Sequence, residues 1–457
     1  MRKLLLPTVF ILFLILRFLP YINNPVPLGY DGGIYLYEYL LFPNLPSWLI
    51  SGFSPGLFAF IYPFAKGFSP ESLLIPVSIL SQIALFISVY FISKKVFSHK
   101  IALLNTFLFS VSLVQFRTFW FFYVKNTFAL ALLLPAFYFL TKKKFLWSVV
   151  FAVLLSYFHL PTFLIYLAVI IILFFVDYKN IKFYLKVLIT TLIIFFLYYL
   201  PAFNTTIYPL LIPVLKSIAP YKLIATGGLA SGGGTFYSMP ISFLMTIFYL
   251  PFALIGAYLL RKEQKVRSFL IALVLLFLMV ITGFFFSVRY FIPFDLFLIF
   301  FAGYGINYVF EKYKSYKDIL PIYFIVLIFF IFAFVLKTSQ PLISSKNLNE
   351  MKDFGKGKSG YVLSTYKEDS AWLLGYTPLK MIAWNFGGEN KYWTDRQWES
   401  FFGNTPISNK LSLLNKIPKP LYIYIGDKQI SNLTDIAFSA CVKKQSPHFY
   451  KYICKDK

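Results

Sequence analysis

The chain has 457 residues, of which 59% are hydrophobic and only 13% are charged. Ordinary soluble domains are about half apolar and about a quarter charged, so this composition excludes a soluble globular protein and indicates an integral membrane protein. The formal net charge is +25, but the basic residues stand in short clusters between apolar runs, which argues against a nucleic-acid-binding stripe.

The N-terminal segment Met1–Pro20 has the basic start and apolar middle of a secretory signal peptide. Arg17 interrupts the end of its apolar run and no small-residue cleavage site follows, so we expect a retained first helix. A spanning helix needs about 20 mostly apolar residues, and by that measure the sequence predicts about 11 crossings. The predicted spans run near residues 4–21, 71–93, 101–117, 126–141, 145–158, 161–177, 185–203, 239–260, 268–285, 290–310 and 318–336.

Basic residues recur in alternate loops between these spans. Lys and Arg close to helix ends are retained on the cytoplasmic side of a membrane. With an odd number of crossings, this pattern predicts a cytoplasmic N-terminus and a C-terminal segment on the outer side. The apolar stretch Leu57–Phe64, flanked by Pro55 and Pro63, is too short and broken to span, so we expect a re-entrant or interfacial piece. The basic clusters lie at residues 2–3, 94–100, 142–144, 179–186, 261–267 and 312–317.

The composition changes from Ser339 to Lys457, where short β-rich runs such as GYVLST and LYIYIG are separated by Pro, Gly, Asn and Asp. This segment is expected to form a small α/β domain outside the membrane. The predicted fold class is an all-α polytopic membrane protein with about 11 transmembrane helices and a small C-terminal extracytoplasmic α/β domain. The predicted domains are a transmembrane domain over 1–338, with outer loops 22–70 and 204–238, and a soluble domain over 339–457.

The two cysteines, Cys441 and Cys454, bracket an expected hairpin, VKKQSPHFYKYI. In an oxidising exterior, a disulfide between them is favoured over two free thiols. Two thiols exclude a zinc site of four thiolates. Asn204 and Asn432 begin glycosylation-type triplets on the same predicted side, which agrees with the predicted orientation.

Acidic residues are scarce on the predicted outer face of the membrane part, where Asp31, Glu38 and Glu71 are the main candidates. A reaction there that needs a general base would draw on this short list. Asp31 lies in a glycine-rich turn of PVPLGYDGGIYLYEYLLFP, residues 25–43, and an interfacial amphipathic helix is expected after it. Asp31 is the predicted catalytic base, with a helix cap as the structural alternative. Glu38 and Tyr35 are candidate substrate contacts, and the alternative for Glu38 is to face lipid headgroups.

A basic set lies at the outer ends of the predicted spans, in VQFRTFWFFYVKNTF, SYFHLPTF and FFFSVRYFIPFDLF. Arg117, Lys125 and Arg289 are the candidate donor-phosphate ligands, because charged donors bind phosphate oxygens strongly. His159 is a candidate substrate contact. The alternative for each residue is interfacial anchoring by a snorkelling side chain or, for His159, a helix break beside Pro161.

Two further charges fall inside predicted spans. Asp295 is expected to pair within the bundle, and Arg17 is expected to partner Asp31 or the phosphate. In the long outer loop, Lys216 and Lys222 are expected to add positive charge or to touch anionic headgroups. The glycine-rich run at 226–236 lacks the Gly-Lys-Ser/Thr ending of a P-loop and is expected to be a gating loop.

These features together resemble the GT-C superfamily of membrane glycosyltransferases that use polyprenyl-phosphate sugars. The resemblance rests on the acid in the first external loop (GYDGGIYLYEY), the amphipathic stretch after it and the external C-terminal domain. The phrases FYVKNTFALALLLPAFYFL and SVRYFIPFDLFLIFFAGYGI are similar to segments of archaeal members. The resemblance implies an inverting sugar transfer from a polyprenyl (dolichol-type) phosphate, in which Asp31 activates the acceptor and Arg289 contacts the donor phosphate. The Trp-Trp-Asp signature of oligosaccharyltransferases is absent, which argues for a monosaccharide donor.

The expected partners are the polyprenyl-phosphate sugar donor, a glycan, protein or lipid acceptor, and membrane lipids, with no nucleic acid. No cofactor is required when basic residues stabilise the leaving phosphate, and a divalent metal is compatible with the same chemistry. The rival class is a transporter or flippase of polyprenyl-linked sugars. It would need polar residues along the middle of several spans, whereas these spans are mostly Leu, Ile and Phe. A third alternative is a non-catalytic scaffold whose outer domain binds a partner.

Overall fold

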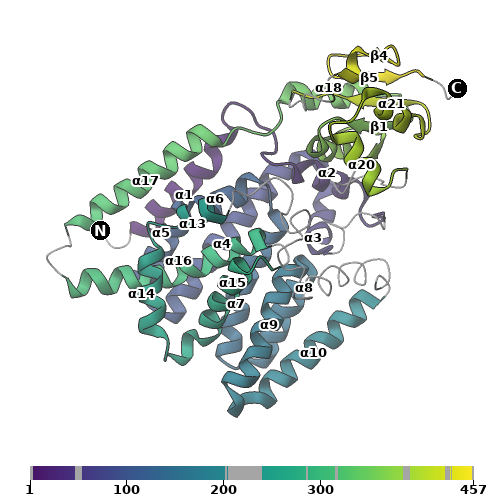
Figure 1. Ribbon diagram of the computed structural model, residues 1–457. Coiled ribbons are helices and arrows are strands. Elements are labelled where there is room, and N and C mark those ends of the chain that lie inside the picture. The colour runs from purple at the N-terminus through teal and green to yellow at the C-terminus, as the bar shows by residue number, and fades with distance from the viewer. Residues whose placement is uncertain are drawn as a thin grey trace. The chain divides into compact units, whose positions relative to one another are not determined.

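The computed structural model describes residues 4–46, 54–200, 203, 239–284, 287–313, 318–383, 392–427, 433 and 435–454. The chain forms two compact units, which we call the helical unit and the sheet unit and describe separately. The helical unit comprises Met1–Asn23, Phe53–Leu57 and Pro76–Gln340. The sheet unit comprises Asn24–Gly52, Phe58–Ile75 and Pro341–Lys457. Figure 1 labels their elements.

The helical unit is a bundle of apolar helices, as expected where the bilayer leaves the backbone no hydrogen-bond partner outside its own helix. Each predicted span coincides with one or two of these helices. Their bounds are α1 Leu5–Phe18, α4 Leu74–Val96, α5 His99–Val111, α6 Leu113–Trp120, α7 Val124–Thr141, α8 Phe145–Phe158, α9 Leu160–Val176, α10 Ile181–Tyr199, α13 Met239–Leu244, α14 Leu250–Leu260, α15 Arg267–Ile281, α16 Ser287–Lys312 and α17 Ile319–Thr338.

Among the described residues, 6 helices are long and apolar enough to cross a membrane, and α5 with α6 makes a seventh if that pair, bent by 51°, is one span. The protein is therefore a multi-pass membrane protein. Shorter apolar helices occupy four more predicted spans, so the total of 11 stays a prediction. The six long ones are Pro70–Val96, Val124–Thr141, Tyr178–Tyr199, Gln264–Ile281, Val288–Lys312 and Ile319–Thr338.

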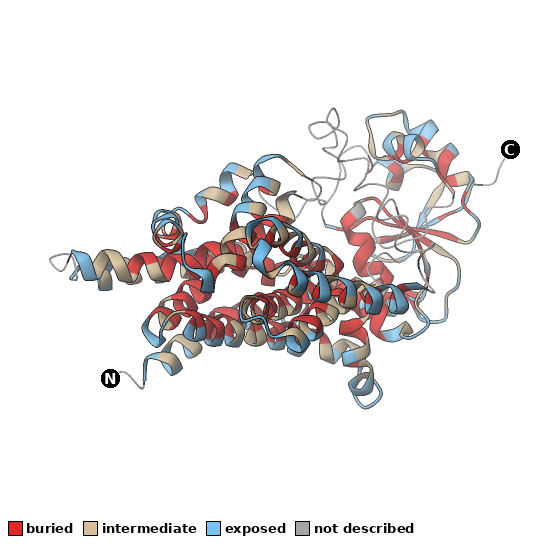
Figure 2. Cartoon of the chain, turned by 90° about the horizontal axis from the view of Figure 1, so that it is seen from below, coloured by how far each residue is buried: buried red, intermediate tan, exposed pale blue. Residues whose placement is uncertain are grey.

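Helix α16 runs through the interior of the helical unit, and almost every side chain from Tyr290 to Ala302 is buried. It packs closely against α14 because glycines face each other there. A Cβ added at Gly256 would lie 2.2 Å from the carbonyl oxygen of Phe301, and one at Gly305 would lie 1.9 Å from that of Phe252. On the outward faces of the bundle, large apolar side chains remain exposed, which is the pattern that lipid covers (Figure 2).

The sheet unit contains a mixed five-stranded sheet in the order β2-β1-β3-β5-β4. Strand β1 is parallel to both β2 and β3, and β5 runs antiparallel to both β3 and β4. The runs GYVLST and LYIYIG form β1 and β3, as the sequence predicts. The elements are α18 Ser345–Gly355, β1 Tyr361–Ser364, α19 Ser370–Tyr376, β2 Lys380–Ile382, α20 Asp395–Phe402, α21 Ile407–Asn415, β3 Leu421–Tyr424, β4 Val442–Lys444 and β5 Phe449–Tyr452.

The expected hairpin and disulfide are both present. Strands β4 and β5 pair with each other, and Cys441 and Cys454 at their outer ends are joined. The triplets at Asn204 and Asn432, the loop lysines Lys216 and Lys222, and the glycine-rich run at 226–236 lie outside the described residues.

Most of the described part of the first predicted loop belongs to the sheet unit. It forms α2 Asp31–Leu41 and most of α3 Gly56–Ala65. Helix α2 packs against α19 with almost no space between the backbones: a Cβ at Gly33 would lie 2.0 Å from the carbonyl oxygen of Ala371. The sequence assigns residues 22–70 to the membrane domain as an outer loop, whereas the packing joins most of them to C-terminal residues. The division at 338 and 339 stays a prediction.

Candidate functional site

Three of the predicted site residues come together in the helical unit. Lys125 lies in the first turn of α7 and is only 6% exposed. Arg289 lies in the first turn of α16, with its guanidinium 5.3 Å from the centre of the Tyr123 ring. Both cations lie within electrostatic reach of the His159 imidazole. Lys125 also follows two residues after Tyr123, whose ring lies against Arg289.

His159 stands at the break between α8 and α9. Its backbone is extended, with φ −159° and ψ 103°, and Pro161 follows within the first turn of α9. The ring Nδ1 hydrogen-bonds the hydroxyl of Thr162 at 2.8 Å. The predicted helix break is thus confirmed, and the same break places the imidazole near Lys125 and Arg289. Its role as a substrate contact stays a prediction.

The turn before α7 is conformationally unusual. Phe122 has a φ of 67°, in the left-handed region that bulky residues rarely adopt. Such strain persists only where the surroundings enforce it, and it often marks functional sites. Phe122 lies between α6 and α7 and directly precedes Tyr123, whose ring lies against Arg289.

Arg117 lies in the last turn of α6, where its guanidinium lies 4.2 Å from the centre of the Trp120 ring and 4.4 Å from that of Phe121. Within the described part of the chain, Arg117 is not among the charges that act on His159. The structure therefore brings Lys125 and Arg289 close to His159, and it stacks Arg117 on two aromatic rings. The role of Arg117 at the donor phosphate stays a prediction.

Asp31 is the first residue of α2, and Gly32 and Gly33 lie inside that helix. The predicted turn around Asp31 is present at the start of α2, since the Gly32 N–H donates to the Gly29 carbonyl oxygen at 3.1 Å, and the helix then continues through Gly32 and Gly33. The Ncap residue is Tyr30, so Asp31 itself occupies the first helical position, where a negative charge is favourable. Asp31 is partly exposed.

Glu38 and Tyr35, the other candidates on α2, are buried. Glu38 is 0% exposed, so it does not face lipid headgroups. The ring of Tyr35 packs 6.2 Å from that of Phe58 on α3. Glu71 is engaged elsewhere in the sheet unit, since both of its carboxylate oxygens accept hydrogen bonds from Lys352 Nζ at 2.7 Å. Of the other two predicted acids, Glu38 is thus buried and Glu71 is paired with Lys352.

Sequence reasoning missed two acids near the start of α2. Glu368 and Asp369 directly precede α19 and are 8% and 6% exposed. Burial raises the pKa of the Tyr30 phenol, and Tyr366 together with the charges of Asp369 and Glu368 raises it further. Both acids therefore lie close to Tyr30, the neighbour of Asp31. The acidic pair in YKEDSAW was the available signal, but only the α2–α19 packing brings it to the first loop.

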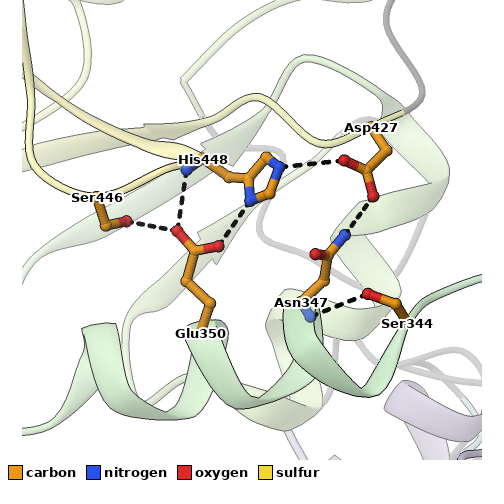
Figure 3. A network of polar contacts seen from close by, with 6 residues as sticks. All are labelled: Ser344, Asn347, Glu350, Asp427, Ser446 and His448. Atoms are coloured by element: carbon orange, nitrogen blue, oxygen red, sulfur yellow. Dashed lines mark hydrogen bonds and ion pairs between the residues drawn. The ribbon is translucent and has the colours of Figure 1, made fainter.

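A second polar cluster of the sheet unit ties α18 to the β4–β5 turn (Figure 3). His448 Nδ1 is 2.6 Å from Glu350, and His448 Nε2 is 3.2 Å from Asp427. Glu350 also accepts from Ser446 Oγ at 2.6 Å, and Asp427 accepts from Asn347 Nδ2 at 2.7 Å. These groups hold one another, so we assign the cluster to stability.

In the part of the chain that the structure describes, no three His, Cys, Asp or Glu side chains are placed to hold a metal ion. Asp31 and its acidic neighbours belong to the sheet unit and the cations belong to the helical unit. That the two sets face one substrate stays a prediction.

No family model and no curated protein matches the chain. Among solved structures, it resembles an Archaeoglobus fulgidus oligosaccharyltransferase tethered to an acceptor peptide, with 14% identity, a TM-score of 0.63, and coverage of 92% of this chain and 68% of that one. The A. fulgidus oligosaccharyltransferase AglB with an inhibitory peptide and a dolichol-phosphate gives 14% identity, a TM-score of 0.61, and coverage of 92% and 69%. ArnT from Cupriavidus metallidurans, bound to undecaprenyl phosphate, gives 10% identity, a TM-score of 0.59, and coverage of 98% and 97%.

The chain thus has the GT-C fold of polytopic membrane glycosyltransferases. The likeness to ArnT extends over nearly the whole of both chains, the C-terminal α/β part included. At 10% to 14% identity, the likeness concerns the fold.

Proposed function

We propose that the protein is a glycosyltransferase that moves a sugar from a polyprenyl-phosphate donor to an acceptor at the outer face of the membrane. The observation that carries the proposal is the meeting of Lys125, Arg289 and His159 in one place in the helical unit. The GT-C fold supports it, because two of the similar proteins were solved with dolichol-phosphate or undecaprenyl phosphate.

The cations serve the phosphate of the donor. Lys125 and Arg289 donate charge-assisted hydrogen bonds to its oxygens, and Arg117 adds positive charge nearby. As the bond between C1 of the sugar and the phosphate oxygen breaks, negative charge grows on the phosphate. Fixed positive charges aimed at that position lower the barrier by about 3 kcal/mol per donor.

Asp31 is the proposed base. It accepts the proton of the acceptor hydroxyl as that oxygen attacks C1 on the face opposite the phosphate, which inverts the configuration at C1. One C–O bond forms, one C–O bond breaks, and the polyprenyl phosphate leaves with the electron pair. Glu38 and Tyr35 are proposed to support substrate binding from α2, and the acceptor is a glycan, a protein or a lipid.

The test uses membranes supplied with a radiolabelled polyprenyl-phosphate sugar. Asp31→Asn should retain donor binding but lose at least about a hundredfold in transfer, the usual contribution of a general base. Asp353→Asn is the matched control, because Asp353 is an exposed surface acid paired with Lys356 in the same unit. Full turnover by Asp31→Asn would show that the base is another group.

The phosphate contact is tested separately. Arg289→Ala should weaken donor binding by about tenfold or more, since a charge-assisted contact is lost. Lys100→Ala is the control, because Lys100 is an exposed cation paired with Glu311. Unchanged donor affinity in Arg289→Ala would remove Arg289 from the site.

A transporter or flippase of polyprenyl-linked sugars is the second candidate, and the break between α5 and α6 favours it. Broken helices at polar sites are common in transporters. The polar groups at this break, Ser112, Gln115 and Asp295, hydrogen-bond one another in a closed network, which suits a rigid element better than a moving one. Movement of a fluorescent polyprenyl-linked sugar across vesicles, unaffected by Asp31→Asn, would favour this candidate.

A further inference from the structure

Arg17 is a buried cation for which the proposed reaction has no use. It lies in the last turn of α1 and is fully buried, with its guanidinium between 5.0 and 5.4 Å from the ring centres of Phe13, Phe116 and Phe119. Its Nε donates to Gln82 Oε1 at 3.2 Å, while Nη1 and Nη2 have no hydrogen-bond partner in the described part of the chain. The aromatic faces offset part of the cost of burying the charge, but they do not explain why a charge is there.

A chain of hydrogen bonds runs from Arg17 to α7, and Arg17 sets its direction. Arginine has only donors, so Gln82 must turn its amide oxygen toward Arg17 and its NH₂ group away. That NH₂ group donates to Thr127 Oγ1 at 3.3 Å. The Thr127 hydroxyl therefore accepts from Gln82 and places its own hydrogen on the carbonyl oxygen of Tyr123, at 2.9 Å.

This series of hydrogen bonds ends at the backbone carbonyl of Tyr123, which is next to the residues of the cation site. The Tyr123 carbonyl also accepts from the Thr127 backbone N–H, at 3.0 Å, so two bonds fix it. Tyr123 is the residue whose ring lies against Arg289, and Lys125 follows two positions later in the first turn of α7. The strained turn at Phe122 directly precedes it, so this carbonyl is a point at which the turn can be held.

We propose that Arg17 is a positioning residue for the donor-phosphate site: through Gln82 and Thr127 it holds Tyr123 and the first turn of α7, and thereby sets Lys125 and Arg289 for a polyprenyl phosphate. This inference rests on the proposed function. This role does not require Arg17 to touch the phosphate. It fixes the orientation of one amide and one hydroxyl, and a misplaced first turn of α7 would separate the two cations that must act together.

The experiment measures binding of dolichyl phosphate and of uncharged dolichol to the full-length protein in phosphatidylcholine nanodiscs. Thr127→Val keeps the side-chain shape but removes the hydroxyl, and Thr127→Ser restores the hydroxyl. Thr106→Val is the matched control, because the Thr106 hydroxyl is also buried and also bonds the carbonyl four residues earlier, in α5 and outside the chain of hydrogen bonds. In Gln82→Glu the carboxylate still accepts from Arg17. It can no longer donate to Thr127 and instead accepts the Thr127 hydroxyl hydrogen, so the Tyr123 carbonyl loses that hydrogen bond.

Thr127→Val and Gln82→Glu should raise the Kd for dolichyl phosphate by about tenfold, the size of effect expected when charged donors are displaced from their target. Thr127→Ser and Thr106→Val should stay close to the wild type, and dolichol binding should be unchanged in every variant. A merely structural role of Thr127 would weaken both ligands equally.

The outcomes separate the two proposals. If the wild type binds dolichyl phosphate no better than dolichol, the proposed function is wrong. If the wild type prefers the phosphate but Thr127→Val and Gln82→Glu behave like Thr106→Val, the function stands and the positioning role is wrong. Should Thr127→Val fail to fold, Gln82→Glu decides alone, since it preserves the volume at that position.

Discussion

Polar side chains inside the apolar bundle are satisfied by specific partners. The carboxylate of Asp295 in α16 accepts hydrogen bonds from the Tyr249 hydroxyl, from Ser112 Oγ at 2.9 Å and from Gln115 Nε2 at 2.8 Å. The expected pairing of Asp295 within the bundle is confirmed, with three neutral donors in place of a cation. Arg17 likewise has one amide partner and three rings. Buried polar groups without such partners would cost several kcal/mol each.

The single carboxyl group of Glu350 should make the stability of the sheet unit depend on pH. Burial alone would raise the pKa of its carboxyl, but hydrogen bonds from Ser446 and His448 outweigh burial and hold the pKa below its usual 4.5. A lowered folded pKa stabilises the fold above pH 4.5, and that contribution is lost as the pH falls through the lower folded value. Glu350→Gln should therefore lower the free energy of unfolding at pH 7 by about 1 to 3 kcal/mol.

The measurement is thermal unfolding followed by tryptophan fluorescence between pH 7 and about pH 3, the range in which carboxyl groups titrate. The difference in Tm between the wild type and Glu350→Gln should shrink toward the acid end. Asp353→Asn, on the same helix but exposed, should show no such trend. A difference that stays constant with pH would mean that the charge of Glu350 does not stabilise the fold.

At the scale of elements, two local features shape the helical unit. Ser112 separates α5 from α6, accepts from the Gln115 backbone N–H at 3.2 Å and donates to Asp295, so the break in the span is pinned from both sides. The second feature is the contact of α14 with α16, where Gly256 and Gly305 allow the two backbones to touch. Replacing Ser112, Gly256 or Gly305 with a larger apolar residue would move a helix, because the interior is closely packed.

Gly305→Ala should therefore destabilise the protein, because its Cβ would lie 1.9 Å from the carbonyl oxygen of Phe252 and would force the helices apart. Overpacking of this kind costs about 1 to 3 kcal/mol. Gly67→Ala is the matched control, since the nearest atom to its added Cβ is 3.9 Å away. The check is the melting temperature of the detergent-solubilised variants by size-exclusion chromatography, and equal melting of both would show that the helices accommodate the methyl group.

At the scale of the whole molecule, the predicted orientation of the chain in the membrane joins the separate features into one mechanism. The basic clusters predict a cytoplasmic N-terminus and an outer C-terminal part. The disulfide between Cys441 and Cys454 agrees with an oxidising compartment for the sheet unit. The proposed reaction needs this arrangement, because Asp31 must reach the same side of the membrane as Lys125 and Arg289.

The orientation can be tested with single introduced cysteines in intact cells. Asp353→Cys should react with a membrane-impermeant maleimide, and Lys100→Cys should react only after the cells are permeabilised. Both side chains are exposed, and the two native cysteines are joined to each other, which keeps the background low. The reverse pattern would place the sheet unit in the cytoplasm and would overturn the proposed outer-face reaction.

Much of the fold could be predicted from the sequence, because its signals are local. Long apolar runs form helices in lipid, the runs around Val362 and Ile423 form strands, and the spacing of Cys441 and Cys454 suits a hairpin. Lys125, Arg289 and His159 were selected because they lie at the outer ends of predicted spans, where basic side chains can donate charge-assisted hydrogen bonds to a phosphate.

The remaining features depend on contacts between segments far apart in the chain. Composition alone could not show that Glu38 is buried, that Glu71 is held by Lys352, or that Gly33 lies against Ala371. It also could not connect Arg17 through Gln82 to Thr127. Apolar length and charge act locally, and they were enough to predict a polytopic membrane protein and the positions of its helices. Which polar groups meet depends on packing between helices that are distant in sequence, and this could be learned only from the folded structure.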